Sequence, residues 1–223
     1  MARLRVAVLI SGRGSNLRQL IAASCDAAYP AEIAFVLSDR PEAAGLAHAG
    51  AAGIPAAVVA HRDRMLFAAD AGRLLDEHRV ELVCLAGFMR VLDAGFVESW
   101  RDRMVNIHPS LLPAFPGLHP QRQALAAGVR FTGCTVHFVR REVDAGPIIA
   151  QAVVAIHPGD DEATLSARIL RVEHRLYPLA VRLIAERRVS VVAGQVKIDG
   201  WQAPNIASLN PRQPPSARIV RKA

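Results

Sequence analysis

Two side chains that can act together on a carbonyl group lie close to each other in the sequence. Asn106 and His108 stand where a short apolar run enters an irregular loop, in the segment VNIHPSLLPAFPGLHP. Residues two apart on a strand face the same side, so both can address one reacting atom while Ile107 faces the core. An amide and an imidazolium that converge on one point can stabilise an oxyanion. This pair alone is equally consistent with a histidine and an asparagine that only hold a strand end and a turn.

A carboxylate can complete the set. Asp144 lies in a tight Asp-Ala-Gly-Pro turn that follows a strand-like run, in the segment TGCTVHFVRREVDAGPI. Next to His108, directly or through a water, it would favour the protonated imidazole. His137 alternates with Thr135 on the same run, and a hydrogen-bonded core histidine is the preferred interpretation of it. The sequence therefore predicts a catalytic set of Asn106, His108 and Asp144.

A third candidate segment, SGRGSN, follows one apolar run and opens a helical one. Its amide N–H groups and the helix dipole suit a phosphate, and Gly12 and Gly14 let a ligand approach the backbone. A dinucleotide fingerprint would need glycine where Leu17 stands, and a Walker loop would need a lysine. A nicotinamide site with Asp39 as its ribose acid, or a turn that serves packing alone, stays open. A single phosphomonoester fits best.

The elements that position these segments follow from the hydrophobic pattern. Strands are predicted over residues 4–10, 33–37, 56–60, 82–86 and 104–107, and helices over 16–23, 43–52 and 64–78. This alternation indicates an α/β fold with a Rossmann-like, mostly parallel, doubly wound sheet. The C-terminal half is predicted to hold a loop, a short helix, a hairpin and a long helix that breaks near Pro178, over 109–120, 121–127, 133–139 with 148–156, and 163–187.

We expect one domain over residues 1–203, with a phosphate-binding half, 1–105, and a catalytic half, 106–203. The Pro, Ser and Arg content of residues 204–223 predicts a mobile tail. Sheets of this kind bind ligands outside the carboxyl ends of their strands. The site is therefore expected on the loops over residues 11–16, 87–92, 106–120 and 140–146.

Composition narrows the class of protein. The 223 residues are 52% hydrophobic and 21% charged, which is typical of a globular chain. No apolar run is long enough for a bilayer and no signal peptide is visible, so we expect a cytoplasmic protein without a membrane partner. Cys25, Cys84 and Cys134 are scattered, which predicts reduced thiols, and no histidine pair has a metal-binding spacing completed by a third ligand. The net charge of +7 is spread along the chain and favours anionic small molecules over nucleic acid.

Several motifs occur together in the order of one known family. They are SGRGSNL, LAGFMRVL, NIHPSLLPAFPGLH, TVHFV followed by DAGPI, and EHRLYPL, from about Arg5 to Leu183. In these motifs the chain resembles the phosphoribosylglycinamide formyltransferases, which are folate-dependent formyltransferases. Asn-x-His-Pro-Ser-x-Leu-Pro followed by an Asp-x-Gly-Pro turn is highly specific to that group, which also includes methionyl-tRNA formyltransferase and formyltetrahydrofolate deformylase.

The resemblance implies a formyltransferase fold and an activity in purine biosynthesis. The formyl group of 10-formyltetrahydrofolate, a co-substrate, would pass to the amine of glycinamide ribonucleotide without a metal. Asn106 and His108 would stabilise the oxyanion, His108 would donate a proton, and Asp144 would keep His108 charged and organise a water. We expect a monomer or a weak homodimer.

The resemblance also implies binding residues. The phosphate would lie on Gly14, Ser15 and Asn16, and Glu173 would contact the ribose or glycinamide end. The folate would contact Asn106 and the backbone of two loops, Met89, Arg90, Val91 and Leu92 in one and Arg140, Arg141, Glu142, Val143 and Asp144 in the other. Arg64 would meet the glutamate tail, because a guanidinium suits a carboxylate; a solvated charge at a helix start is the alternative.

The chain departs from the family pattern at two places. Ala145 stands where glycine is more usual and restricts the loop, and Pro120-Gln121 replaces a polar residue and a histidine. The tRNA enzyme usually has a long second domain and a different first loop. The deformylase usually has an N-terminal regulatory domain and is the alternative enzyme. A nucleotide- or RNA-binding module without catalysis would leave the set of Asn106, His108 and Asp144 unexplained.

Overall fold

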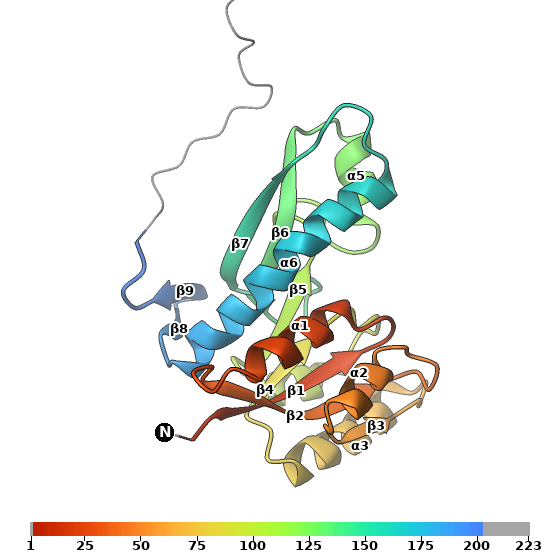
Figure 1. Cartoon of the computed structure of the whole chain (residues 1–223), viewed down its shortest axis with the longest axis vertical. Coiled ribbons are helices and arrows are strands. Elements are labelled where there is room, and N and C mark those ends of the chain that lie inside the picture. The colour runs from red at the N-terminus through yellow and green to blue at the C-terminus, as the bar shows by residue number, and fades with distance from the viewer. Residues whose placement is uncertain (1, 203–223) are drawn as a thin grey trace, which may run out of the picture.

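The protein folds around one sheet with helices on both of its faces (Figure 1). The structure is a computed structural model and describes residues 2–202; the tail predicted over residues 204–223 lies outside this range. Within the described range, the strands form a seven-stranded sheet in the order β3-β2-β1-β4-β5-β6-β7 and a separate two-stranded sheet.

Strands and helices alternate along the chain as predicted. The first half holds β1 (Leu4–Ile10), α1 (Ser15–Ser24), β2 (Ala31–Ser38), α2 (Leu46–Ala51), β3 (Ala56–Val58), α3 (Arg64–Glu77), β4 (Leu82–Leu85), α4 (Ala94–Ser99) and β5 (Met104–His108). The second half holds α5 (Pro120–Ala126), β6 (Phe131–Phe138), β7 (Ile148–Ala155), α6 (Glu162–Ala185), β8 (Val189–Val192) and β9 (Gln195–Ile198).

The sheet is parallel from β3 to β5, and β6 and β7 extend it in antiparallel fashion. The strand order runs in opposite directions from β1, toward β2 on one side and toward β4 on the other. Open sheets bind their ligands at such a switch point. The prediction of a doubly wound, mostly parallel sheet is confirmed.

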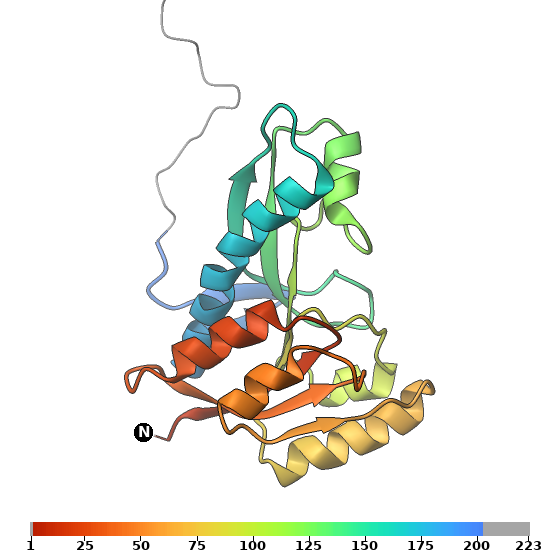
Figure 2. The ribbon, with the colours of Figure 1, turned by 45° about the vertical axis from the view of Figure 1, so that its right-hand side comes forward.

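Two apolar clusters cover the two faces of the sheet. The side chains of β1 alternate between them, with Val6 and Val8 in the first cluster and Ala7 and Leu9 in the second. The first cluster includes residues of α1, α2 and α6, and the second includes residues of α3 and α4. Figure 2 shows α1 and α2 on one side of the sheet and α3 on the other.

The prediction that the long helix breaks near Pro178 is wrong, because α6 is continuous. Proline removes one backbone donor and disfavours a helix interior. Here Tyr177 and Ala180, on either side of Pro178, are both fully buried in the first cluster. The Tyr29 hydroxyl also donates to the Pro178 carbonyl over 2.8 Å. Packing on both sides of the proline therefore outweighs the local preference for a break.

Two short elements were not predicted. Helix α4 has only six residues, too few for periodicity to show, and it begins where the Asp93 carboxylate accepts from the N–H of Phe96. The β8–β9 hairpin turns at Ala193 and Gly194, which have φ values of 51° and 78°. The alternating valines around this Ala-Gly pair are the signal that could have indicated a hairpin.

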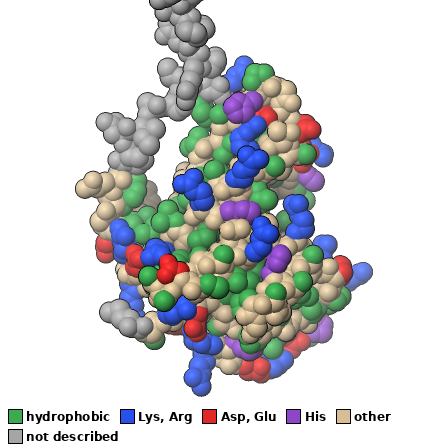
Figure 3. Space-filling model, viewed as in Figure 1, with side chains coloured by type: hydrophobic (Ala, Val, Ile, Leu, Met, Phe, Trp, Pro, Cys, Tyr) green, Lys and Arg blue, Asp and Glu red, His purple; other side chains and the backbone are tan. Residues whose placement is uncertain are grey.

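The surface carries charges of both signs. On the face in Figure 3, Lys and Arg side chains are scattered over the upper and lower parts of the molecule, with acidic side chains between them. Within residues 2–202, no helix combines the length and apolar character that crossing a membrane requires.

Candidate active site

The pairing of β5 with β6 brings the first candidate residues together. Asn106 lies opposite His137, and His108 lies opposite Thr135. His108 is buried and Asn106 is half-buried. The strand extends one residue beyond its predicted end, so His108 is its last residue rather than the first residue of the loop.

The His108 ring lies between two oxygen atoms. Its Nδ1 is 3.3 Å from Asp144 Oδ2, and its Nε2 is 2.9 Å from the carbonyl oxygen of Phe115. A carboxylate and a carbonyl both accept hydrogen bonds, so a ring protonated at both nitrogens satisfies both contacts. The structure thus brings Asp144 within direct reach of His108.

Asp144 has a left-handed backbone, with φ of 56°, and its side chain is only 9% exposed. Its Oδ2 accepts from the N–H of Gly117 over 2.8 Å, and its Oδ1 lies 3.7 Å from His137 Nε2. Burial by itself raises the pKa of this carboxyl, but the contacts with His137 and Gly117 and the charge of His108 together hold it below its usual value. Asp144 is therefore favoured as a carboxylate.

His137 is both a buried, hydrogen-bonded histidine and a member of this cluster. Its Nδ1 lies 2.9 Å from the carbonyl oxygen of Phe138, which requires a proton on that nitrogen. Its Nε2 lies 3.3 Å from Asn106 Nδ2 and also faces Asp144 Oδ1, so with a proton it donates to the carboxylate and without one it accepts from the amide. The second hydrogen of the Asn106 amide stays available for a ligand. The contact between Asn106 and His137 could not be predicted from sequence patterns, because it depends on the β5–β6 register.

The loop over residues 109–117 supplies both backbone contacts of the His108–Asp144 pair. A buried network beneath it fixes its position. The Thr135 hydroxyl donates to the Ser110 carbonyl over 2.7 Å and accepts from the N–H of Leu112 over 3.0 Å. Gln151 Nε2 lies 2.9 Å from the Leu112 carbonyl and 3.0 Å from the Thr135 hydroxyl. Thr135 and Gln151 thus hold the segment that carries Phe115 and Gly117.

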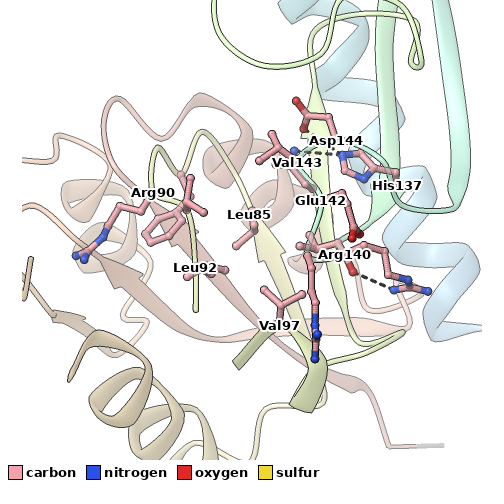
Figure 4. A pocket seen from close by; sticks show the side chains of 14 residues that line it. Leu85, Arg90, Leu92, Val97, His137, Arg140, Glu142, Val143 and Asp144 are labelled. Carbon is pink, nitrogen blue, oxygen red and sulfur yellow. Dashed lines mark hydrogen bonds and ion pairs between the residues drawn. The ribbon is translucent and has the colours of Figure 1, made fainter. Parts of the chain in front are cut away.

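A cavity of about 140 Å³ opens beside this cluster. Asp144 and His137 lie at one end of it, and Arg90 lies toward the other (Figure 4). One wall of the cavity is apolar and is formed by β4 and the segment after it. The opposite wall is formed by residues 139–144, which follow β6. Of the predicted folate contacts, those that line it are Arg90, Val91, Leu92, Asn106, Arg140, Arg141, Glu142, Val143 and Asp144.

Two predicted folate contacts lie outside the cavity lining. The Met89 residue is 67% exposed, and its backbone N–H donates to the Ser11 hydroxyl over 2.8 Å. Arg64 is exposed at the first residue of α3. Arg140, in the second loop, is tied to Asp102 by an ion pair of 2.5 Å.

The glycine loop, residues 11–16, meets α6 through a buried polar contact. Gly14 caps α1 with φ of 69° and without a side-chain hydrogen bond, so the first N–H groups of the helix are not capped. Asn16 Nδ2 donates to Glu173 Oε2 over 2.8 Å, and both residues are buried. Burial raises the pKa of Glu173, although the bond from Asn16 opposes this. In the described part of the chain, Asn16 Oδ1 has no partner, which leaves an acceptor for a ligand.

No group of three or more His, Cys, Asp or Glu side chains within residues 2–202 is arranged to hold a metal ion.

Comparisons with known proteins agree on one family. The sequence profile described as formyl transferase matches residues 4–181. The trifunctional purine biosynthetic protein adenosine-3 of Drosophila pseudoobscura pseudoobscura is 52% identical over 205 residues, which are 88% of this chain and 15% of that protein. The chain thus spans a small part of this curated relative. The phosphoribosylglycinamide formyltransferase of Escherichia coli (strain K12) is 39% identical over 90% of this chain and 96% of its own length.

Solved structures show the same likeness. Glycinamide ribonucleotide transformylase 1 from Symbiobacterium toebii has a TM-score of 0.85 and 46% identity, covering 88% of this chain and 94% of its own. A formyltetrahydrofolate deformylase from Pseudomonas syringae pv. tomato has a TM-score of 0.82 but 29% identity, covering 88% of this chain and 66% of its own.

The network under the 109–117 loop predicts different effects for two matched substitutions on β6. Thr135→Val should lower the free energy of unfolding by about 1–3 kcal/mol, because the N–H of Leu112 loses its acceptor and the Ser110 carbonyl loses its donor. Thr132→Val should be close to neutral, because the equally buried Thr132 hydroxyl has no partner among the described residues. Urea unfolding of both variants measures this, and equal losses would contradict the network.

The raised pKa of Glu173 predicts how Glu173→Gln changes stability with pH. Below the unfolded pKa, about 4.5 for an ordinary glutamate, the carboxyl is protonated in both states and its burial as a charge costs nothing. As the pH rises above that value, the unfolded state releases its proton first, so the buried carboxyl increasingly destabilises the native state. Glutamine avoids this cost. The melting temperature of Glu173→Gln should therefore exceed that of the wild type increasingly from acid to neutral pH; a difference that stays constant would contradict the burial effect.

Proposed function

This chain belongs to the formyl transferase family, and on that premise we propose that it transfers a formyl group from 10-formyltetrahydrofolate to the amine of glycinamide ribonucleotide. The products are formylglycinamide ribonucleotide and tetrahydrofolate. The observation that carries the proposal is the contact of the buried His108 ring, over 3.3 Å, with Asp144, which lines a cavity together with Asn106. Relatives of similar length named for this activity support it.

The proposed reaction is an acyl transfer. The amine nitrogen attacks the formyl carbon, a C–N bond forms, and the carbonyl electrons move to oxygen. The free N–H of Asn106 and the protonated His108 ring stabilise that oxyanion. To do so, His108 Nε2 exchanges the Phe115 carbonyl for the oxyanion, which is the stronger acceptor. The intermediate then collapses: the bond to the folate nitrogen breaks, and a proton passes from the attacking amine to the leaving nitrogen.

Asp144 acts through His108 in this proposal. Its carboxylate accepts a hydrogen bond from the Nδ1–H of the ring, and the N–H of Gly117 holds the carboxylate in place. The same carboxylate lines the cavity, and in this proposal it also organises a water for proton transfer. Burial strengthens each of these interactions, because little water competes for the charges.

The cavity beside the cluster is the proposed folate site. The wall formed by residues of β4 and the following segment, such as Leu85 and Leu92, offers an apolar surface for the flat pterin. Arg64, at the start of α3, would meet the glutamate tail outside the cavity. Its exposure suits a mobile, charged tail better than a buried ring.

The glycine loop is the proposed site of the ribonucleotide phosphate. Gly14, Ser15 and Asn16 present the uncapped start of α1, where the helix dipole favours an anion. Glu173 and the unpartnered Asn16 Oδ1 are both acceptors, which suits the hydroxyl or amine donors of the substrate's neutral part. The N-terminal half, residues 1–105, would thus hold the phosphate, and the second half, residues 106–203, would carry out the transfer.

A formyltetrahydrofolate deformylase is the second candidate, and the likeness to the Pseudomonas syringae structure favours it. Water, rather than an amine, would then accept the formyl group. The phosphate-binding character of the glycine loop would have no purpose in that reaction.

Release of deformylated folate, followed by absorbance, distinguishes the candidates. We expect release from a formylfolate analogue only when glycinamide ribonucleotide is present. His108→Ala and Asp144→Asn should each lower kcat on the order of a hundredfold or more, because the oxyanion loses its donor or the donor loses its partner.

Release without the amine would favour the deformylase, and no release would favour a binding module. Near-normal turnover by either folded variant would reject the assigned roles. Thr132→Val, on the neighbouring strand, serves as the control with normal turnover.

A further inference from the structure

The glycine loop is packed directly against the start of α2, backbone to backbone. The N–H of Gly45 donates to the Gly12 carbonyl over 2.9 Å. A Cβ added to Gly14 would lie only 2.6 Å from the Cα of Gly45. No side chain separates the two segments at this contact, and Figure 2 shows α2 beside α1 on the same face of the sheet.

Conformation does not explain the glycine at position 45. Its φ of −62° and ψ of −22° are ordinary right-handed values that alanine adopts easily. Space does explain it: an added Cβ would lie 2.6 Å from Ile10 Cδ1, 3.0 Å from Gly14 Cα and 3.1 Å from the Gly12 carbonyl oxygen. Inside α2, by contrast, a Cβ added to Gly50 would meet nothing within 4 Å.

The contact between Gly45 and the glycine loop, residues 11–16, can determine where that loop lies. On one side the loop meets α2 through Gly45, and on the other Asn16 is bonded to Glu173 of α6. The loop is therefore held between two helices, with its backbone N–H groups fixed in space. The Ile10 side chain can move aside for a new methyl group, but the backbone at Gly12 and Gly14 can yield only by moving the loop.

We propose that Gly45 is a positioning residue for the phosphate-binding loop. Its lack of a side chain lets α2 fix the loop in the conformation that receives the ribonucleotide phosphate. This inference rests on the proposed function. It adds a residue outside the loop, in a different element, that controls affinity for one substrate without touching it.

Gly45→Ala, at the N-cap of α2, tests the proposal, with Gly50→Ala inside that helix as the matched control. Displacement of the loop should raise the KM for glycinamide ribonucleotide by roughly tenfold or more, because small misplacements of binding groups have large effects. The kcat at saturation and the KM for formylfolate should stay near their wild-type values, since the folate cavity lies elsewhere. Gly50→Ala should leave all three constants unchanged.

A second variant separates positioning from folding. Ile10→Val combined with Gly45→Ala removes the Cδ1 clash but keeps the contacts with Gly12 and Gly14. Its melting temperature should recover toward the wild type while the KM for the ribonucleotide stays raised. An unchanged KM in Gly45→Ala, a KM that recovers together with stability, or failure of both variants to fold would each overturn the proposal. A wild-type enzyme that does not use glycinamide ribonucleotide would instead refute the proposed function.

Discussion

The structure of the site depends on keeping a carboxylate ionised where little water reaches it. Asp144 is nearly buried, and one of its oxygens receives both the His108 ring and the N–H of Gly117. A buried charge is stable only with a partner, and removal of one partner leaves an uncompensated charge. Three segments, the end of β5, the 109–117 loop and the turn at Asp144, must therefore stay in place together.

Strand β6 and helix α6 hold these segments and the glycine loop in place. The antiparallel addition of β6 to β5 sets His137 opposite Asn106, and Thr135 on the same strand supports the loop that carries Gly117. Helix α6 crosses the first face of the sheet and delivers Glu173 to the glycine loop. The glycine loop and the His108–Asp144 cluster thus follow different strands of one sheet, near the point where its strand order reverses.

Those parts of the fold and the site that depend on neighbouring residues in the sequence could be predicted. The period of two placed Asn106 and His108 on one side of a strand, and alternation of strands and helices predicted the sheet. Contacts that depend on register or on distant packing could not be predicted in this way. From the residue types, Asp144 could be predicted only as a possible partner of His108. The contact of Asp144 with the N–H of Gly117 could not be predicted, because it depends on the path of two loops. The need for glycine at position 45 could not be predicted from the sequence, because its backbone is ordinary and only its close neighbours exclude a side chain.

The most direct test of whether His108 and Asp144 act as one unit is a double-mutant cycle on kcat for His108→Ala and Asp144→Asn. If Asp144 works through His108, the double variant should be no slower than the slower single variant, since the second change removes a partner that has already lost its function. Losses that multiply in the double variant would show that the two side chains contribute independently, which would contradict the coupling on which the site is built.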